Sequence, residues 1–361
     1  MGRGVVESDY IFDDEREEYK HTRQVNWTHF VEETHPGQAV QKTLTDITPY
    51  TDYVEKLEAL FLEEIEEDEP EIDYTSYTQE DFLTDVYMSE KQYNTLKELL
   101  LRKKNVILQG APGVGKTFAA KRLAFSIMEK KDTSRVKVVQ FHQSYSYEDF
   151  VRGWRPDGEK FELGRGPFYD FCKLAEVDDE NVPYFFIIDE INRGNLSKIF
   201  GELLMLIEGD KRGDSIRLLY GKEDFTVPKN VHIIGMMNTA DRSLAMIDYA
   251  LRRRFAFFDL SPAFQSDGFK AYRESIGNSK FDNLIAVVEK LNDDISKDTS
   301  LGNGFRIGHS YFCVEKDVNI DDDWLSDVVK YELVPLLKEY WFDEPSKFEN
   351  WSKQLWSAIN G

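Results

Sequence analysis

A run of glycines that ends in a lysine and a threonine is the part of this sequence that points most directly to chemistry. The run, Gly110–Thr117, reads Gly-Ala-Pro-Gly-Val-Gly-Lys-Thr. Glycines at these positions let the backbone adopt positive φ angles and turn its N–H groups toward an anion. The lysine can reach the β- and γ-phosphates of a nucleotide, and the threonine hydroxyl can ligate Mg²⁺. The run therefore predicts a phosphate-binding loop.

The segments on either side of this loop support the prediction. The apolar run Asn105–Leu108 precedes it, and the helix-forming run Phe118–Ala124 follows it. Strand, glycine loop and helix form the context in which this pattern binds phosphate, and the positive end of the helix points at the same place. A tight turn without a ligand is the alternative, but it does not require all the fixed positions of the pattern. The residues predicted to bind the nucleotide are Gly110, Ala111, Pro112, Gly113, Val114, Gly115, Lys116, Thr117 and Phe118.

A second stretch, Tyr184–Glu190, places two carboxylates directly after an apolar run. The apolar residues predict a strand that is buried on both faces, as in a parallel sheet. Asp189 and Glu190 then emerge at the carboxyl end of the strand, where open α/β sheets bind ligands. We expect Asp189 to hold Mg²⁺, directly or through water, and Glu190 to act as general base on the attacking water. A solvated strand end is the alternative, and the phosphate loop in the same chain argues against it.

Two more segments could complete such a site. Asn238 follows an apolar strand that begins at Val231, and its amide could orient the hydrolytic water and contact the γ-phosphate. Arg252, Arg253 and Arg254 end the next predicted helix. Cations at that position favour the helix dipole, but ring-forming nucleotide hydrolases also present an arginine finger to the neighbour's nucleotide from there. Three arginines exceed what a helix end needs, so we predict that at least one is a finger.

Candidates for further nucleotide contacts lie outside these segments. Arg306 stands in a predicted helical lid, from which it could approach the phosphates, and a surface arginine is an equal alternative. In nucleotide-binding domains of this build, the segment upstream of the first strand usually lies over the base. Val86, Tyr87 and Met88 are therefore candidates for base contacts, with core packing as the alternative.

The composition is that of a folded, acidic protein. The chain has 361 residues, of which 41% are hydrophobic, and a formal net charge of −22. This charge argues against a surface that grips nucleic acid over its whole extent, but it leaves room for a local basic stripe or pore. There is no apolar run of about 18 residues and no secretory signal, so no membrane span is expected. Two cysteines make neither a disulfide framework nor a cysteine zinc site, and a cytoplasmic location is expected.

The order of patterns predicts three parts. Residues 1–75 form an N-terminal arm with an acidic linker, residues 76–260 an α/β nucleotide-binding domain with a parallel sheet between helices, and residues 261–361 a small helical lid. In the first part, Glu17–Trp27 is interpreted as the last strand of a β-domain that is otherwise missing, so the chain is either truncated or begins with an arm that packs elsewhere. This stretch resembles the closing part of EVE-like nucleic-acid-reading domains, with an ordinary arm as the alternative. Tyr53–Leu62 predicts an amphipathic helix.

The motifs of the second and third parts together resemble the AAA+ motor subunit of the McrBC modification-dependent restriction systems. The phosphate loop and the acidic strand end are common to many AAA+ proteins. The Met-Asn-Thr-Ala-Asp-Arg-Ser run is more particular, because this family uses GTP and has that run near the nucleotide. The resemblance covers about residues 80–361. It is carried by Gly110–Thr117, Asp189–Arg193, Met237–Ser243, Ala250–Phe255 and Arg306–Tyr311.

This resemblance implies an AAA+ P-loop fold, a hexameric ring and GTP (or ATP) with Mg²⁺. It also implies a McrC-type nuclease subunit as partner, and DNA bound through the pore and through a missing or partial N-terminal domain. The matching positions are Lys116 and Thr117 for phosphate and Mg²⁺, Asp189 and Glu190 for the Walker B pair, Asn238 for the sensor residue and Arg252–Arg254 for the finger.

Three functions therefore compete. The first is a GTP-hydrolysing ring that translocates on DNA and drives a partner nuclease. The second is an ATP-dependent remodelling chaperone of the MoxR kind, and the Met-Asn-Thr-Ala-Asp-Arg-Ser run argues against it. The third is a scaffold that binds nucleotide with little turnover, and the intact Glu190 argues against it.

Overall fold

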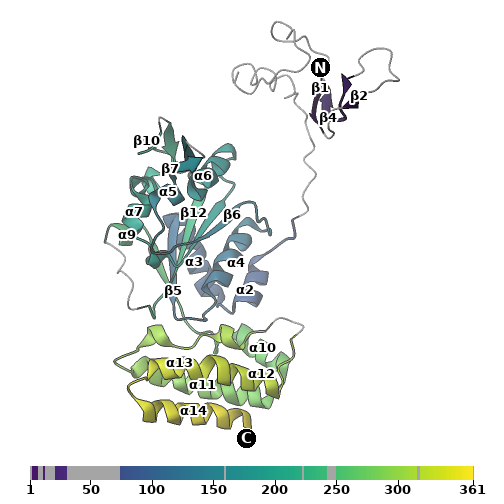
Figure 1. The fold of residues 1–361 in the computed structure, drawn as a ribbon. Helices are drawn as coiled ribbons and strands as arrows, with labels where there is room; N and C mark the ends of the chain where they lie inside the picture. The colour runs from purple at the N-terminus through teal and green to yellow at the C-terminus, as the bar shows by residue number, and fades with distance from the viewer. Residues whose placement is uncertain are drawn as a thin grey trace. The chain divides into compact units, whose positions relative to one another are not determined.

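The computed structural model describes residues 2–6, 11–12, 21–30, 74–157, 160–221, 223–241, 249–314 and 318–360 (Figure 1). The chain divides into two compact units, Met1–Asp73 and Tyr74–Gly361, and each is described by itself. The helix predicted over Tyr53–Leu62 lies outside the described residues. Among those that are described, no helix combines the length and the apolar character that crossing a bilayer requires.

The described part of the first unit consists of two short antiparallel strand pairs. Strand β1 (Gly2–Val6) pairs with β4 (Val25–Phe30), and β2 (Ile11–Phe12) pairs with β3 (His21–Thr22). The sequence analysis predicted one closing strand within Glu17–Trp27 whose partners lie outside the chain, and this is wrong. The stretch contains β3 and the start of β4, and the partner strands lie earlier in the same chain.

The second unit is built on a parallel sheet of five strands in the order β13-β5-β12-β9-β6. This confirms the predicted α/β fold with a parallel sheet. Apolar residues dominate the three central strands, β5, β12 and β9, and burial on both faces explains this composition. The strands are β5 (Asn105–Gly110), β6 (Val136–Gln140), β9 (Tyr184–Asp189), β12 (Val231–Asn238) and β13 (Ala256–Leu260).

Helices cover both faces of the sheet, because alternate residues of each strand point to opposite sides. Phe185 and Ile187 of β9 enter one core, whereas Phe186 and Ile188 enter the other. The first core is covered by α2 (Gln79–Val86), α3 (Glu90–Lys103) and α4 (Lys116–Met128). The second is covered by α5 (Tyr147–Phe150), α6 (Pro167–Val177), α7 (Leu196–Phe200), α8 (Leu203–Leu206) and α9 (Tyr249–Arg252).

Two β-hairpins interrupt this α/β pattern. Strands β10 (Ser215–Arg217) and β11 (Asp224–Thr226) form one of them. In the other hairpin, β8 (Lys160–Arg165) pairs with β7 (Arg152–Asp157).

A helical lid follows the last strand, as predicted (Figure 1). A π-helical segment, Val328–Leu333, separates two of its α-helices. The lid helices are α10 (Asp267–Ile276), α11 (Ser279–Lys297), α12 (Asp322–Asp327), α13 (Val334–Tyr340) and α14 (Pro345–Asn360).

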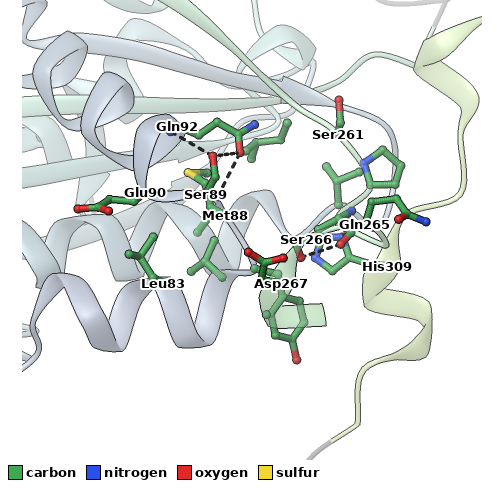
Figure 2. A pocket seen from close by; sticks show the side chains of 18 residues that line it. Leu83, Met88, Ser89, Glu90, Gln92, Ser261, Gln265, Ser266, Asp267 and His309 are labelled. Atoms are coloured by element: carbon green, nitrogen blue, oxygen red, sulfur yellow. Dashed lines mark hydrogen bonds between the residues drawn. The ribbon is translucent and has the colours of Figure 1, made fainter. Parts of the chain in front are cut away.

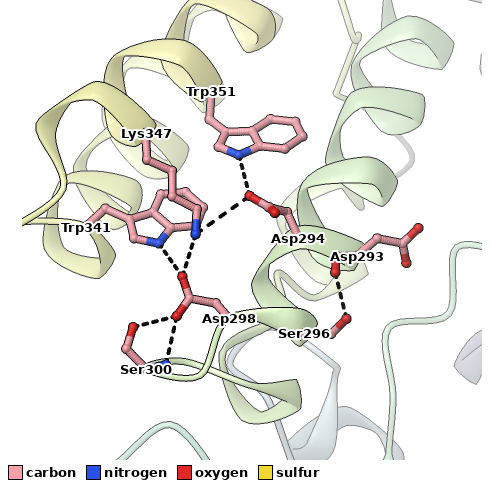
Figure 3. Close-up of polar contacts among 8 residues, drawn as sticks. All are labelled: Asp293, Asp294, Ser296, Asp298, Ser300, Trp341, Lys347 and Trp351. Carbon is pink, nitrogen blue, oxygen red and sulfur yellow. Dashed lines mark hydrogen bonds and ion pairs between the residues drawn. The ribbon is translucent and has the colours of Figure 1, made fainter.

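One carboxylate ties three of these helices together (Figure 3). Asp298, which ends α11, accepts hydrogen bonds from Lys347 Nζ of α14 at 2.6 Å and from Trp341 Nε1, after α13, at 2.9 Å. Its other oxygen accepts from the N–H and the hydroxyl of Ser300, at 2.8 and 2.6 Å. These bonds to Lys347 and Ser300 hold the pKa of Asp298 well below its usual value.

We expect Asp298→Asn to destabilise the lid by about 2 kcal/mol at neutral pH, because the amide loses the charge that Lys347 and Trp341 donate to. The depressed pKa of Asp298 means that its contribution is complete above the unfolded-state pKa of about 4 and is lost as the pH falls below it. The difference in the free energy of unfolding between wild type and variant should therefore become smaller as the pH falls. Urea unfolding curves at several pH values measure it. Asp293→Asn, an exposed carboxylate on the same helix, is the matched control, and an equal loss in both variants would contradict the prediction.

Candidate nucleotide-binding site

The predicted phosphate loop connects β5 to α4 and has the required backbone shape. Gly113 and Gly115 have φ angles of 74° and 75°, in the left-handed region that favours glycine. Gly110 allows a close approach of another kind, because a Cβ there would lie 2.3 Å from the carbonyl oxygen of Leu260 on β13. The loop therefore curls at two glycines and packs against the neighbouring strand at the third.

Lys116 is buried at the start of α4, with 9% of its surface exposed. Its ammonium donates to two carbonyl oxygens of the loop at 2.9 and 3.0 Å, which places the charge within the loop. Burial lowers the pKa of this ammonium to about 8, although the charges of Glu190, Asp189 and Asp241 act in the opposite direction. The lysine therefore stands at a desolvated position where a phosphate would restore its preference for the charged form.

The register of the sheet brings the catalytic candidates to one edge. Asn238, at the end of β12, is the pairing partner of Gly110, at the end of β5, and Thr239 N–H donates to the Gly110 carbonyl at 3.1 Å. On its other side β12 pairs with β9, which ends at Asp189. Carboxyl ends of parallel strands thus place the loop, the amide and the acidic pair side by side.

Glu190 is held on both of its carboxylate oxygens. Its backbone has a φ of 50°, which is uncommon outside glycine, and turns the side chain out of the strand direction. Oε1 accepts from Asn238 Nδ2 at 2.7 Å, and Oε2 accepts from Arg193 Nε at 3.1 Å. Such fixed orientation is what a general base requires, since it must lie within hydrogen-bond reach of the water it activates.

Two residues that the sequence analysis left without a role join this network. Arg193 also donates through Nη2 to Asp241, at 3.3 Å, so one guanidinium bridges the acidic strand end and the loop after β12. Arg193 and Asp241 lie within the motifs Asp189–Arg193 and Met237–Ser243. The spacing could have suggested the contact between Arg193 and Glu190, because Arg193 follows Glu190 by three residues in a 3-10 turn. Arg242 and Ser243, which end the motif Met237–Ser243, lie outside the described residues.

The donor set suits Mg²⁺ with a nucleotide. Thr117, the second residue of α4, offers a hydroxyl beside the loop, and Asp189 offers a carboxylate whose Oδ1 accepts from its own neighbour's N–H at 3.0 Å. Hydroxyl and carboxylate oxygens are ligands that Mg²⁺ takes together with waters and substrate phosphates. Within the described residues there is no group of three or more His, Cys, Asp or Glu side chains that could hold a metal ion alone. Thr117 and Asp189 would thus hold the metal only in company with the phosphates.

The lid touches the phosphate loop directly. Gly308 N–H donates to the Pro112 carbonyl at 3.2 Å, and Ser310 N–H donates to the Gly113 carbonyl at 2.9 Å. A Cβ on Gly308 would lie 1.9 Å from the carbonyl carbon of Gly113, so only glycine permits this contact. The ring of Tyr311 covers Gly113 from the same side. The sequence analysis quoted this lid segment for its resemblance and did not foresee these contacts.

His309, in the same segment, presents a nitrogen toward the loop. Burial lowers its pKa to about 4, so the ring is neutral at neutral pH. Its Nδ1 accepts from the N–H of Ala263 at 3.1 Å, which leaves the proton on Nε2. Nε2 lies 3.8 Å from the position that a Cβ on Gly115 would take. The lid thus brings a neutral hydrogen-bond donor to the loop.

A cavity of about 540 Å³ opens beside the loop (Figure 2). Val114 and Ala119 form its wall toward the loop and α4, and the segment between α2 and α3 forms another. Val86, Tyr87 and Met88, the candidates for base contacts, all line it. The volume falls in the range of ligand-sized sites, and its position next to the phosphate loop suits the base of a nucleotide.

Arg252, which ends α9, and the two arginines that follow it differ in their surroundings. Arg254 is 8% exposed, and it pairs with Glu208 at 2.7 Å and donates to the Leu204 carbonyl at 2.6 Å. Arg253 is exposed and shares Glu208 at 3.0 Å, and Arg252 is exposed with its guanidinium 5.8 Å from the ring centre of Phe257. Arg254 is therefore built into the domain, whereas Arg252 and Arg253 face outward.

Arg306 is half-buried and donates to Ser261 Oγ at 3.2 Å and to the Asn303 carbonyl at 3.3 Å. Ser261 lines the cavity beside the loop, so Arg306 lies at the edge of that cavity. Its approach to the phosphates stays a prediction.

Family models match three parts of the chain. Residues 105–255 match an AAA domain of the dynein-related subfamily, and residues 283–349 match the alpha-helical lid domain of McrB. Residues 1–51 match a domain of unknown function. The first two matches coincide with the parallel sheet and the helical lid.

Two characterised relatives belong to restriction systems. The chain is 51% identical over 290 residues to the "Type IV methyl-directed restriction enzyme EcoKMcrB subunit" of Escherichia coli K12, a match that covers 78% of this chain and 63% of that protein. It is 24% identical over 300 residues to the "Type II restriction enzyme BsuMI component YdiS" of Bacillus subtilis 168, covering 69% of this chain and 83% of that protein. The chain thus spans less than two thirds of the length of its E. coli relative.

A solved structure from Cytophaga hutchinsonii matches with a TM-score of 0.32 and 15% identity, over 58% of this chain and 66% of that one. This likeness is too slight to carry an argument.

We expect the affinity for nucleotide to fall as the pH rises through about 8, because the phosphates bind the protonated form of Lys116. The loss should approach tenfold per pH unit above this value and level off at the higher pKa of the bound complex. Titration with a fluorescent nucleoside diphosphate between about pH 7 and pH 9 measures it. Lys116→Ala should bind more weakly and show a flat profile, and parallel profiles in the two proteins would contradict the assignment.

Proposed function

Because this chain belongs to the McrB-type AAA+ proteins, we propose that it is a nucleoside triphosphatase with GTP as its preferred substrate. The observation that supports this best is the position of Glu190. Its two oxygens are held by Asn238 and Arg193 at the sheet edge that also carries the phosphate loop. A water placed between this carboxylate and the γ-phosphate would meet a fixed general base, with Lys116 and Mg²⁺ to balance the charge on the phosphates.

The proposal extends to a ring that moves DNA and activates a separate nuclease subunit. The E. coli relative is described as a subunit of a methyl-directed restriction enzyme, and the chain shares its lid domain and half of its aligned residues. This chain would act as the motor, and a McrC-type subunit would cut the DNA. The same identity to a restriction subunit argues against the alternative of a MoxR-like remodelling chaperone.

The exposed arginines support a site shared between protomers. Arg252 and Arg253 face outward, whereas Arg254 is anchored by Glu208 and a backbone carbonyl. A guanidinium that completes a neighbour's site must leave its own domain, and the buried Arg254 is poorly placed to do so. We assign the finger to Arg252 or Arg253, and to Arg254 the task of fixing the segment that carries them.

Glu190→Gln should abolish turnover while nucleotide still binds. The amide keeps an oxygen that accepts from Asn238 but cannot take a proton from water, and general-base contributions are typically about 10²–10⁴-fold. Hydrolysis of GTP and of ATP by both proteins, with and without the partner nuclease subunit, measures this. Turnover of the variant within about threefold of wild type would overturn the role of Glu190. Faster hydrolysis of ATP than of GTP by wild type would overturn the proposed substrate.

Arg252→Ala and Arg253→Ala, made separately, should distinguish the finger from its neighbour. Loss of the finger should spare nucleotide binding and reduce turnover by about 10³–10⁵-fold. Adding Lys116→Ala protein, which has an intact finger and a defective loop, should restore part of the activity at mixed interfaces. Hydrolysis across a titration of one variant into the other measures the restoration. Normal hydrolysis by both arginine variants would show that neither is a finger, and a failure to restore activity in proven mixed rings would show an action within one protomer.

A further inference from the structure

We propose that Asp267, at the start of α10 in the lid, reads the purine base by accepting hydrogen bonds from N1–H and the 2-amino group of guanine. This inference rests on the proposed function, because it concerns the base that the proposed nucleotide site selects. It names a specificity residue in the lid, outside the phosphate loop and the acidic strand end.

The cavity beside the loop is the place where this contact would form. Asp267 lines it together with Val114 and Ala119, which adjoin the loop (Figure 2). Its walls include the apolar side chains Leu83, Val86, Met88, Leu260 and Pro262. Apolar walls hold the faces of a flat base and leave its polar edge to be read by a few groups. The question is therefore which polar group at this cavity is free to read that edge.

Most polar side chains around the cavity are committed to other groups. Ser89 and Gln92 bond to each other in the capping box of α3, Ser266 caps α10, and Ser261 accepts from Arg306. The remaining committed side chains are Glu90, which accepts from Gln79, Gln265, which donates to Glu289, and His309, which accepts from Ala263 N–H. Among the described residues, Asp267 has no hydrogen-bond or ion-pair partner for its carboxylate, and it is exposed at the cavity. Its carboxylate is the acceptor left for a ligand.

The start of α10 is held firmly against the base-side segment. Ser266 Oγ accepts from the N–H of Phe269 at 3.2 Å and donates to the Ala263 carbonyl at 2.7 Å. A Cβ on Gly268 would lie 2.8 Å from the ring of Tyr87, so the helix start meets this ring closely. Tyr87 in turn lies 5.6 Å from Phe269 and 5.8 Å from His309, ring centre to ring centre. Tyr87 thus serves to position the lid, and the carboxylate of Asp267 is carried by a fixed helix end.

The chemistry of a carboxylate favours guanine over adenine. Guanine presents two adjacent donors, N1–H and the 2-amino group, and both can bond to the two oxygens of one carboxylate. Adenine presents one donor, its 6-amino group, beside the acceptor N1, which a carboxylate repels. Hydrogen bonds to a charged partner are about twice as strong as neutral ones, so the difference should be at least about tenfold in affinity.

The test is an exchange of base preference in Asp267→Asn. The amide can accept from N1–H and donate to the 2-carbonyl of xanthine, whereas it opposes the 2-amino group of guanine. We expect wild type to bind GDP at least about tenfold more tightly than ADP, IDP or XDP. In the variant, the affinity for GDP should fall by about tenfold and the affinity for XDP should rise by about tenfold. Isothermal titration calorimetry with these four diphosphates measures binding without hydrolysis.

Asp323→Asn is the matched control, because it removes an exposed carboxylate from the first turn of another lid helix, α12. It should leave the order of the four diphosphates unchanged. An unchanged order in Asp267→Asn, in a protein that unfolds at the same temperature as wild type, would overturn the inference. That result is distinct from failure of the proposed function, which would appear as wild type hydrolysing neither GTP nor ATP. Equal loss of all four diphosphates in the variant would also overturn it, since a reader of the base edge must discriminate.

Discussion

The backbone contact between the lid and the phosphate loop is the constraint on which the rest of the site depends. Gly308 lies so close to Gly113 that no side chain fits between them, and two lid N–H groups donate to loop carbonyls. These bonds use carbonyl oxygens of the loop, so they do not compete with a phosphate for its N–H groups. The lid and the loop are therefore joined directly, and both line the cavity beside the loop.

The second constraint is the register of the parallel sheet. Pairing of Asn238 with Gly110 fixes the amide beside the loop, and Asn238 then fixes Glu190 through a bond of 2.7 Å. Arg193 holds the other oxygen of Glu190 and is itself held by Asp241. Glu190 is thus oriented by two strands and two side chains, which preorganises it for its proposed role as general base.

Local patterns predicted the parallel sheet, the loop and the acidic strand end, because each depends on a short segment and its immediate neighbours. The apolar run Tyr184–Ile188 is one example, and the structure has strand β9 there, over Tyr184–Asp189. Contacts between distant segments could not be predicted in this way. No pattern around Gly308 indicates that its backbone contacts the loop. The residues near Arg193 likewise do not indicate that its guanidinium also donates to Asp241. The N-terminal strand was wrong for the same reason, since its partner β1 lies at the other end of the segment.

Strand β5 also connects the loop to the arginines at and just after the end of α9. Asn105 begins the strand that Gly110 ends, and its side chain donates to the Arg254 carbonyl at 3.0 Å and to the Ile207 carbonyl at 2.7 Å. Its Oδ1 accepts from the buried Arg212 at 2.6 Å. These bonds are buried, so breaking them would leave polar groups without partners at a cost of about 1–3 kcal/mol each. The segment that presents the outward-facing arginines is therefore fixed to the strand that carries the phosphate loop. If one of those arginines acts on a neighbouring protomer, a shift of the loop in one site is transmitted through β5 to the next.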